Sequence, residues 1–223
     1  MKKNKKIVIF GNTLLAQTVC DYFTVFSEYE VVAFTVDKQY IQDSTFYDHT
    51  IAPFEDIEIL YPPSEYDLFV AVGSSKLNAV RATIFKQAKA KGYYLPTFIH
   101  PLAYIAPHVT IGENCLIMEY ARVLTRSKLE NNIIIWPGGS VSHDCVIHDN
   151  AYIVSGMGGF CEIGENSFIG MSSTIADHVV VAPNSFITMG TVIRKNTKEN
   201  SIYTGNPAKR NKYVSAIDYF SIQ

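Results

Sequence analysis

Two histidines, each followed directly by an aspartate, stand close together in the stretch SVSHDCVIHDN at residues 140–150. Imidazole, with an ordinary pKa of about 6.5, can accept a proton at neutral pH, and a neighbouring carboxylate favours the imidazolium that forms. His143 and Asp144 are therefore a candidate general-base pair. Histidines can also bind a metal ion, so the residues alone leave an acyl-transfer enzyme, a metal enzyme and a non-catalytic scaffold open.

The surrounding residues follow a strict six-residue period. An aliphatic residue recurs at every sixth position, and a mostly small residue follows each one four positions later. A helix repeats every 3.6 residues and a plain strand every two, so this period instead indicates a β-helix whose coils bury their aliphatic residues against one another. The aliphatic positions are Ile105, Ile111, Ile117, Val123, Leu129, Ile135, Val141, Ile147 and Ile153, followed after a break by Ile163, Ile169, Ile175, Val181, Ile187 and Ile193.

The period predicts which side chains face solvent around the histidines. Val141 and Cys145 take the two inward positions of their hexad, so His143 and Asp144 are expected to point outward near a corner. His148 takes a position usually given to a turn residue, and a structural role is expected for it.

The first hundred residues alternate strand-like and helix-like segments, which predicts a small doubly wound α/β domain. KIVIFG, EVVAFTVD and DLFVAVG are the predicted strands, and YYLPTFIHP is expected to close the unit. One helix is predicted after Asn12, which would cap it, and a second after Ser74 or Ser75, with Leu77 on its apolar stripe and Gly92 at its end. Residues 38–66 are left unassigned.

Composition narrows the possible partners and location. The chain of 223 residues carries 19 basic and 21 acidic side chains, which argues against nucleic acid or an anionic membrane as the main partner. Its apolar runs are far shorter than the roughly 20 residues that span a bilayer. The basic start, residues 2–6, precedes too short an apolar run for a signal peptide and is predicted to be a solvated tail. The four cysteines lack metal-ligand spacing, so buried thiols and a cytoplasmic location are expected.

Nearly the whole chain resembles the hexapeptide-repeat sugar acetyltransferases of the bacillosamine and sialic-acid pathways. The resemblance is tightest over FIHP at 98–101, SHDCVI at 142–147, IGENSFIG at 163–170 and GNPAKR at 205–210. It implies a small Rossmann-like domain at residues 1–100 and a left-handed parallel β-helix of about five coils, with a C-terminal tail, at residues 101–223. It also implies that His143 is the general base and that Asp144 raises its basicity.

The resemblance further implies acetyl-CoA as co-substrate and a homotrimer with active sites between subunits. The residues expected near the coenzyme are Tyr152, Gly159, Met171, Met189, Lys209 and Arg210. A backbone N–H of the glycine-rich turn 156–159 is expected to bind the oxyanion of the tetrahedral intermediate. The chain departs from the family twice, because Tyr152 replaces a histidine and the interval from Ile153 to Ile163 is ten residues instead of twelve.

In the family that the chain resembles, the first domain holds the nucleotide end of a nucleotide-linked sugar. The matching positions here are Gly11, Asn12, Thr13, Asp37, Gly73 and Ser74. The loop after the first strand has a single glycine, so it is a weak dinucleotide fingerprint and NAD binding is not expected. Asp37, at the end of the second strand, could accept from a ribose hydroxyl or a base N–H, or could be a simple turn residue.

The predicted function is acetyl-CoA-dependent N-acetylation of a nucleotide-linked amino sugar in surface glycan biosynthesis. O-acetylation of a sugar with the same histidine base is the alternative. A zinc enzyme resembling the γ-carbonic anhydrases is less expected, because His108 and His143 are 35 residues apart and so occupy different hexad positions. No resident metal is predicted. A non-catalytic β-helix would not need the attached α/β domain.

Overall fold

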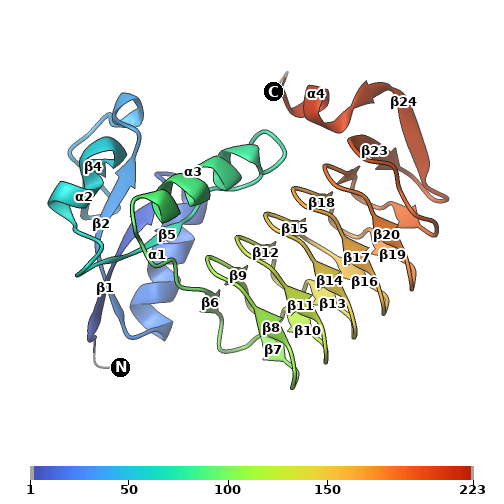
Figure 1. Cartoon of the computed structure of the whole chain (residues 1–223), viewed down its shortest axis with the longest axis horizontal. Helices are drawn as coiled ribbons and strands as arrows, with labels where there is room; N and C mark the ends of the chain where they lie inside the picture. Colours follow the sequence, from blue (N-terminus) through green and yellow to red (C-terminus); the bar gives the residue numbers. More distant parts are fainter. Residues whose placement is uncertain (1–2, 222–223) are drawn as a thin grey trace. The chain divides into compact units, whose positions relative to one another are not determined.

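The computed structural model describes residues 3–221, which form two compact units. The first contains the chain up to Gly73 together with Thr83–Pro96, and the second contains Ser74–Ala82 together with the chain from Thr97 onward. Figure 1 shows the first unit in blue to green and the stacked coils of the second in green to red. The domain boundary expected near residue 100 stays a prediction.

The first unit is built on a mostly parallel sheet with strand order β3-β4-β2-β1-β5. Three strands expected from apolar runs are present, and two more lie in the segment left unassigned. The bounds are β1 Lys5–Phe10, β2 Tyr29–Val36, β3 Thr45–Phe46, β4 His49–Pro53 and β5 Asp67–Val70. The chain leaves β1 toward β2 and β4 and returns to β5 on the other side of β1. The carboxyl ends of β1 and β5 therefore meet at a switch point, where open α/β sheets bind ligands.

The helices of this region are α1 Leu14–Phe26, the 3₁₀ turns η1 Lys38–Tyr40 and η2 Phe54–Asp56, α2 Ile57–Leu60, and α3 Ala79–Ala90, which the two units share. The predicted cap of α1 was wrong. Thr13 takes the cap position without a side-chain bond, whereas Asn12 donates from Nδ2 to the Tyr40 carbonyl at 3.4 Å.

The described part of the basic start is exposed, as the predicted solvated tail requires, but it is bonded to α1 and continues into β1. Lys3 Nζ donates to three carbonyls at the end of α1, those of Phe23, Thr24 and Ser27, at 2.6–3.0 Å. It thereby satisfies acceptors that a helix C-terminus leaves unpaired. Lys5 and Lys6 belong to β1, and Lys2 lies outside the described residues.

The second unit is a parallel β-helix with three faces. Face 1 contains β7 Tyr104–Ile105, β10 Arg122–Val123, β13 Ser140–Val141, β16 Gly156–Met157, β19 Thr174–Ile175 and β22 Val192–Ile193. Face 2 contains β8 Thr110–Ile111, β11 Lys128–Leu129, β14 Val146–Ile147, β17 Glu162–Ile163 and β20 Val180–Val181. Face 3 contains β6 Phe98–Ile99, β9 Leu116–Ile117, β12 Ile134–Ile135, β15 Tyr152–Ile153, β18 Phe168–Ile169, β21 Phe186–Ile187, β23 Ser201–Thr204 and the antiparallel β24 Lys209–Ser215.

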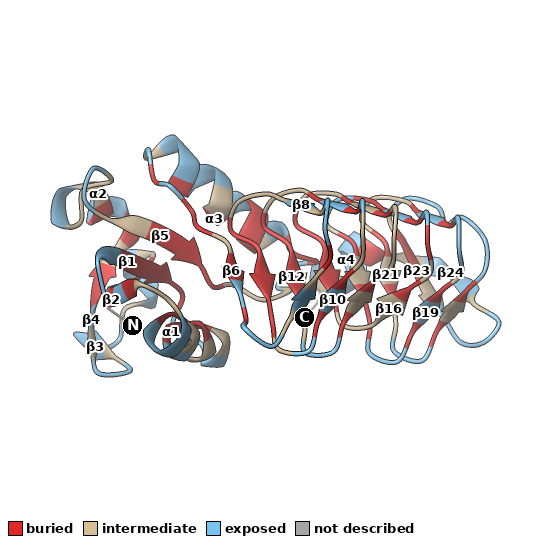
Figure 2. Cartoon of the chain, turned by 90° about the horizontal axis from the view of Figure 1, so that it is seen from below, coloured by how far each residue is buried: buried red, intermediate tan, exposed pale blue. Residues whose placement is uncertain are grey.

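The residues that recur every six positions are those whose side chains point inward from the strands of the β-helix. The periodic aliphatic residues from Ile117 onward are at most 2% exposed and form one continuous core with the small residues that follow them. Figure 2 shows these buried positions following the coils along the β-helix. YYLPTFIHP closes the first unit only through its first four residues, where the Tyr94 carbonyl accepts from Leu68 N–H at 3.0 Å, because β6 in its second half pairs in parallel with β9.

The break in the period is a shortened corner. Strands of successive coils pair 18 residues apart, as Arg122 with Ser140, but Ser140 pairs with Gly156 after only 16. Two residues, 154–155, join β15 to β16, where four residues join β12 to β13. Met157, only 6% exposed, takes the inward position of this coil, a position that the six-residue spacing did not predict.

Asparagines form a hydrogen-bonded ladder along the corner between faces 2 and 3. Asn114, Asn132, Asn150, Asn166 and Asn184 all have positive φ, between 52 and 64°. Each of the first four donates from Nδ2 to Oδ1 of the next asparagine, at 2.7–3.2 Å. Asparagine tolerates the left-handed conformation that these corners require, and stacking its amide groups satisfies them where water is excluded.

Face 3 is covered by apolar side chains from both ends of its unit. On its outer surface Tyr152 stacks on Phe168 with ring centroids 5.0 Å apart, and Phe168 contacts Phe186 at 5.5 Å. Leu77 and Ala216, the first residue of α4 (Ala216–Ser221), are buried against these rings. Leu77 was expected on the stripe of the second helix, but it precedes α3 in a left-handed turn.

Arg81, completely buried, fastens the start of α3 to the asparagine ladder. Its Nε donates to the Asn132 carbonyl at 3.2 Å and its Nη2 to the Asn150 carbonyl at 2.7 Å. The guanidinium also lies 5.6 Å from the centre of the Tyr152 ring. Burial lowers the pKa of Arg81 to about 10, so it remains charged at neutral pH. Within residues 3–221, no helix is long and apolar enough to cross a membrane.

Replacing Asn132 by alanine is expected to destabilise the second unit by about 2 kcal/mol, because two buried amide partners lose their bonds. Asn132→Gly should lose less, because glycine relieves the positive φ. Ser172→Ala, at an exposed corner with φ of 57°, is the matched control. Thermal unfolding midpoints measure the three, and an Asn132→Ala loss no larger than that of Ser172→Ala would contradict a stabilising ladder.

Candidate active site

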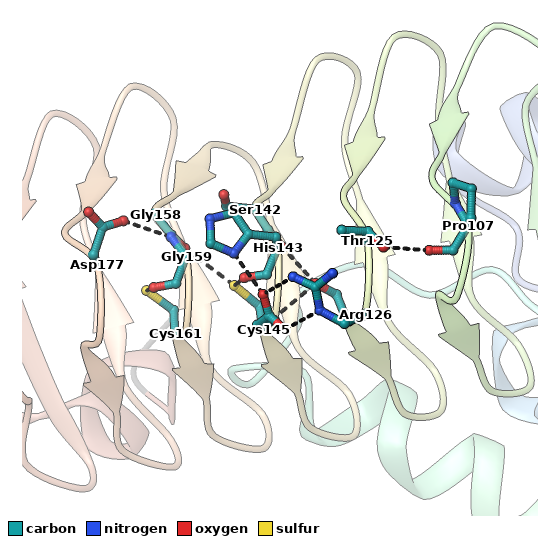
Figure 3. Close-up of polar contacts among 12 residues, drawn as sticks. Pro107, Thr125, Arg126, Ser142, His143, Cys145, Gly158, Gly159, Cys161 and Asp177 are labelled. Atoms are coloured by element: carbon teal, nitrogen blue, oxygen red, sulfur yellow. Dashed lines mark hydrogen bonds and ion pairs between the residues drawn. The ribbon is translucent and has the colours of Figure 1, made fainter.

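His143 lies on the corner between faces 1 and 2, in the loop that joins β13 to β14. Its side chain is 44% exposed, whereas Val141 and Cys145 on either side of it are completely buried. Figure 3 shows the imidazole on the outside of the coil and the Cys145 sulfur on the inner side. The structure thus has the outward orientation that the hexad pattern predicts.

One nitrogen of the imidazole bonds to Asp144, which is itself bonded to Arg126. His143 Nδ1 and Asp144 Oδ2 are 2.8 Å apart. Arg126, one coil earlier on the same corner, donates from Nε to Asp144 Oδ1 at 2.7 Å and from Nη2 to Oδ2 at 2.8 Å. Hydrogen bonds from Arg126, and then from His143, lower the pKa of Asp144 to about 2. With a carboxylate acceptor at Nδ1, Nε2 is the nitrogen available to accept a proton.

The turn after the shortened corner packs directly against the imidazole. A Cβ at Gly159 would lie 2.6 Å from His143 Cε1, so only glycine fits there without moving the ring. The N–H groups of this turn were expected to bind an oxyanion, but two of them are already engaged. Gly159 N–H donates to Asp177 Oδ1 at 2.7 Å and Gly158 N–H to the Ile175 carbonyl at 2.9 Å. The expectation was therefore wrong for these two groups.

Two aromatic rings continue the same corner beyond His143. The Phe160 ring meets the His143 ring edge-on, with centroids 5.2 Å apart, and stacks on His178 at 4.7 Å with an interplanar angle of 4°. Phe160 is 51% exposed. Arg126, Phe160 and Asp177 were not predicted from the sequence. The coil length of 18 residues could have found Arg126 from Asp144 and Asp177 from Gly159, but Phe160 follows a coil of 16.

Face 1 carries an open hollow of about 570 Å³ that leads to this corner. Its floor and rim hold small side chains, among them Ser140, Gly156 and Thr174, and the shortened loop contributes Ser155. Gly158 also lines the hollow, next to the glycine that touches His143. The two-residue shortening and the run of small residues therefore leave room for a ligand beside the imidazole.

The residues predicted to bind the coenzyme divide between the faces. Gly159 adjoins His143, and the exposed Met171 and Met189 lie one coil apart on the corner between faces 3 and 1. Tyr152 lies elsewhere, on the outer surface of face 3, and is only 6% exposed. Its ring is covered by Phe168 and faces Arg81, which leaves little of it for a coenzyme to touch.

Lys209 and Arg210 are exposed at the start of β24. A second cavity, of about 380 Å³, lies beside them at the end of face 1, and its lining includes Arg194, Lys195 and Ala208. The predicted basic pair thus has two further cations near it, after β22. The sequence gives no sign of this grouping, because it depends on the hairpin of β23 and β24.

The residues predicted to hold a nucleotide sugar belong mostly to the switch point of the first unit. Gly11 follows β1 with φ of 135°, and a Cβ there would lie 2.7 Å from the Ala71 carbonyl oxygen beyond β5. Asn12 and Thr13 continue that loop, and Gly73 follows β5. Ser74 is the first residue that clusters with the β-helix.

Asp37 follows β2 and lines a separate cavity of about 510 Å³ with Phe54, Glu55 and Lys91. Partial burial raises its pKa, and the negative charge of Glu55 adds to the effect.

His148 lies on the outer surface after β14, between two carboxylates. Its Nδ1 is 3.1 Å from Glu130 Oε2 and its Nε2 is 2.8 Å from Glu162 Oε1. Burial opposes protonation, but the bonds to Glu162 and Glu130 outweigh it and raise the pKa of His148. Both ring nitrogens are engaged, which agrees with the structural role predicted for this residue.

His108 and Asp144 lie two coils of 18 residues apart and take the same corner position, with positive φ. His143, which is 35 residues from His108, therefore takes the neighbouring position, as predicted. Among residues 3–221, no three histidine, cysteine or acidic side chains are grouped as metal ligands would be. All four cysteines are free and buried, as expected.

Known proteins share both the repeat and the whole architecture. Residues 160–195 match the family model described as Bacterial transferase hexapeptide (six repeats). The acetyltransferase domain of PglB from Neisseria gonorrhoeae is 28% identical, with a TM-score of 0.83 over 93% of this chain and 100% of that one. A structure of that domain with acetyl coenzyme A is 26% identical, covers the same shares and has a TM-score of 0.84.

The chain has the hexapeptide-repeat fold of sugar acetyltransferases. Perosamine N-acetyltransferase from Caulobacter crescentus, solved with CoA and GDP-perosamine, shares the fold at 24% identity, with a TM-score of 0.83 over 92% of this chain and 96% of that one. These matches confirm the resemblance noted from the sequence. They also confirm the fold class, an α/β domain followed by a left-handed parallel β-helix.

A curated relative with a different name matches less than half of this chain. Mitochondrial gamma carbonic anhydrase 1 from Arabidopsis thaliana is 27% identical over 107 residues, which are 45% of this chain and 35% of that protein. The chain thus spans about a third of the length of this curated relative.

His148→Gln should destabilise the protein at pH 5.5 but little at pH 9. A raised folded-state pKa stabilises the fold fully below the unfolded value of about 6.5, and this contribution disappears as pH rises through the folded value. Melting temperatures of both proteins across this range test the prediction. An equal difference at the two pH values would rule out a protonated His148 between the carboxylates as the cause.

Proposed function

We propose that the protein transfers the acetyl group of acetyl-CoA to the amino group of a nucleotide-linked amino sugar, with His143 as general base. The observation that carries this proposal is the exposed imidazole, held at Nδ1 by an ionised Asp144 and packed against Gly159, next to Gly158, which lines the open hollow of face 1. The likeness to an acetyltransferase domain solved with acetyl coenzyme A supports the co-substrate.

In this mechanism the amine nitrogen bonds to the thioester carbonyl carbon while His143 Nε2 takes the amine proton. The tetrahedral intermediate then breaks its carbon–sulfur bond, and the proton passes from the imidazolium to the leaving thiolate, so that an amide and free CoA are formed. Asp144 stays negative throughout, because its pKa of about 2 lies far below neutral pH. It therefore stabilises the transient imidazolium without taking the proton itself.

We place acetyl-CoA along face 1, with its thioester at the Gly159 turn. Met171 and Met189 border that face, and Lys209, Arg210, Arg194 and Lys195 gather at its C-terminal end, where cations can meet phosphates. Tyr152 is left out of this site because of its burial on face 3. We further propose the homotrimer implied by the resemblance, in which a neighbouring subunit would close the open hollow.

We place the nucleotide at the switch point of the first unit. Gly11 and Gly73 let the backbone approach a ligand closely, and Asn12 and Thr13 add polar groups at the start of α1. Asp37 and Ser74 complete the proposed set.

O-acetylation remains the alternative, because the same base would serve a sugar hydroxyl. The match to a gamma carbonic anhydrase favours a zinc enzyme as a second candidate, whose ligands would have to come from more than one subunit.

Purified protein is expected to release CoA thiol when given acetyl-CoA and one of a panel of UDP-, dTDP- and GDP-linked 4-amino sugars. His143→Ala should lower the rate on the order of 10³-fold, because the proton acceptor is removed. Thiol release and the mass of the product are measured. Release only with hydroxyl acceptors would favour O-acetylation. Stoichiometric zinc in the purified protein, together with hydration of carbon dioxide to bicarbonate, would favour the metal enzyme instead.

Gly159→Ala is expected to lower the turnover number on the order of a hundredfold, because the added methyl group displaces the imidazole. Gly159 lacks a positive φ, so the backbone tolerates alanine and the melting temperature should change little. Gly156→Ala is made for comparison at saturating acetyl-CoA, because it adds a methyl group to the hollow while its Cβ would meet Ser140 at an ordinary 3.6 Å and lie away from the imidazole. If Gly159→Ala keeps the full turnover number, the ring position in this structure is not the catalytic one.

A further inference from the structure

The strongest unexplained feature near the proposed base is the two-point ion pair between Arg126 and Asp144. Both residues occupy the same position of successive coils, with φ of 60° and 57°, so the corner geometry places one side chain beside the other. Two parallel N–H···O bonds of 2.7 and 2.8 Å fix the plane of the carboxylate as well as its position. A lysine could supply the charge here but not the fork.

The shared oxygen links this pair to the imidazole. Asp144 Oδ2 contacts both Arg126 Nη2 and His143 Nδ1, each at 2.8 Å. The guanidinium therefore determines where the carboxylate presents its second lone pair, and so which way the imidazole turns. We propose that Arg126 is a positioning residue for the acetyl-transfer reaction, which holds Asp144 so that His143 Nε2 faces the hollow on face 1. This inference rests on the proposed role of His143 as base.

Arg126 also acts through its charge, in the opposite direction to Asp144. A cation beside the carboxylate weakens the attraction between that carboxylate and an imidazolium, so the imidazolium releases its proton more readily. The other charged or titratable groups around His143 are Asp177, bound to the adjacent Gly159 N–H, and His178, stacked behind Phe160. The thiols of Cys145 and Cys161 lie beneath the corner. Among these described groups, Asp144 is the one that bonds to the imidazole, and Arg126 reaches the imidazole through Asp144.

The test separates orientation from charge with two variants of Arg126 and one control. Arg126→Met removes both the charge and the fork, and Arg126→Lys keeps the charge alone. Lys86→Met removes an exposed cation from α3, which belongs to none of the three faces or their corners. The turnover number and its dependence on pH are measured for all three against the unmodified protein.

Arg126→Met is expected to lower the turnover number on the order of tenfold, with the KM values for both substrates within about twofold, because the base is misplaced while binding is kept. The acidic limb of its pH–rate profile should move to higher pH. Arg126→Lys should restore that limb but only part of the rate, and Lys86→Met should match the unmodified protein. An unmoved limb in Arg126→Met, or full activity in it, would overturn the proposal.

A second readout does not depend on activity. The imidazole of His143, followed by NMR as pH changes, should titrate at higher pH in Arg126→Met than in Arg126→Lys or in the unmodified protein. If the unmodified protein transfers no acetyl group while this difference is present, the proposed function fails and the positioning role stands. An identical titration in all of these proteins would mean that Arg126 does not act on the histidine.

Discussion

Burial of one aliphatic residue in every six is the constraint on which the rest of the structure depends. Each coil has little core of its own and gains it only by stacking on the next, so the inward positions are fixed along the whole β-helix. Once Val141 and Cys145 point inward, the residues between them must turn outward at a corner. The position of the proposed base follows from core packing, without any interaction specific to the histidine itself.

At the corners, residues with left-handed backbone conformation bring side chains of successive coils into contact. Equivalent corner residues lie one above another in successive coils, so that a long side chain meets its counterpart from the next coil. Between faces 2 and 3 this stacking produces the neutral asparagine ladder, which serves only stability. Between faces 1 and 2 it produces the charged and aromatic series Arg126, Asp144, Phe160 and His178. The same backbone geometry thus supports a structural corner and a candidate catalytic corner.

The three faces also have different surroundings. Face 3 is occupied, because the turn before α3, the buried Arg81 and helix α4 cover its aromatic residues. Face 1 carries small side chains and the shortened loop, which leave an open hollow beside His143. Tyr152 and His143 lie nine residues apart in sequence but on different parts of the prism. Closeness in the sequence of a β-helix therefore says little about closeness in space, whereas separation by a whole coil says a great deal.

The sequence by itself determined the repeat, its inward residues and the outward direction of His143, because a six-residue period allows one way to bury the aliphatic side chains. It also indicated the parallel strands of the first unit, whose apolar runs are unambiguous. Only the tertiary structure decided the role of Met157, the bonding of the Gly158 and Gly159 N–H groups and the burial of Tyr152. These depend on how many residues each coil contains and on which segments cover each face. The shortening shows in the sequence as a ten-residue interval, but the contacts of the turn that it produces do not, and the packing of Arg81 against Tyr152 leaves no periodic signal.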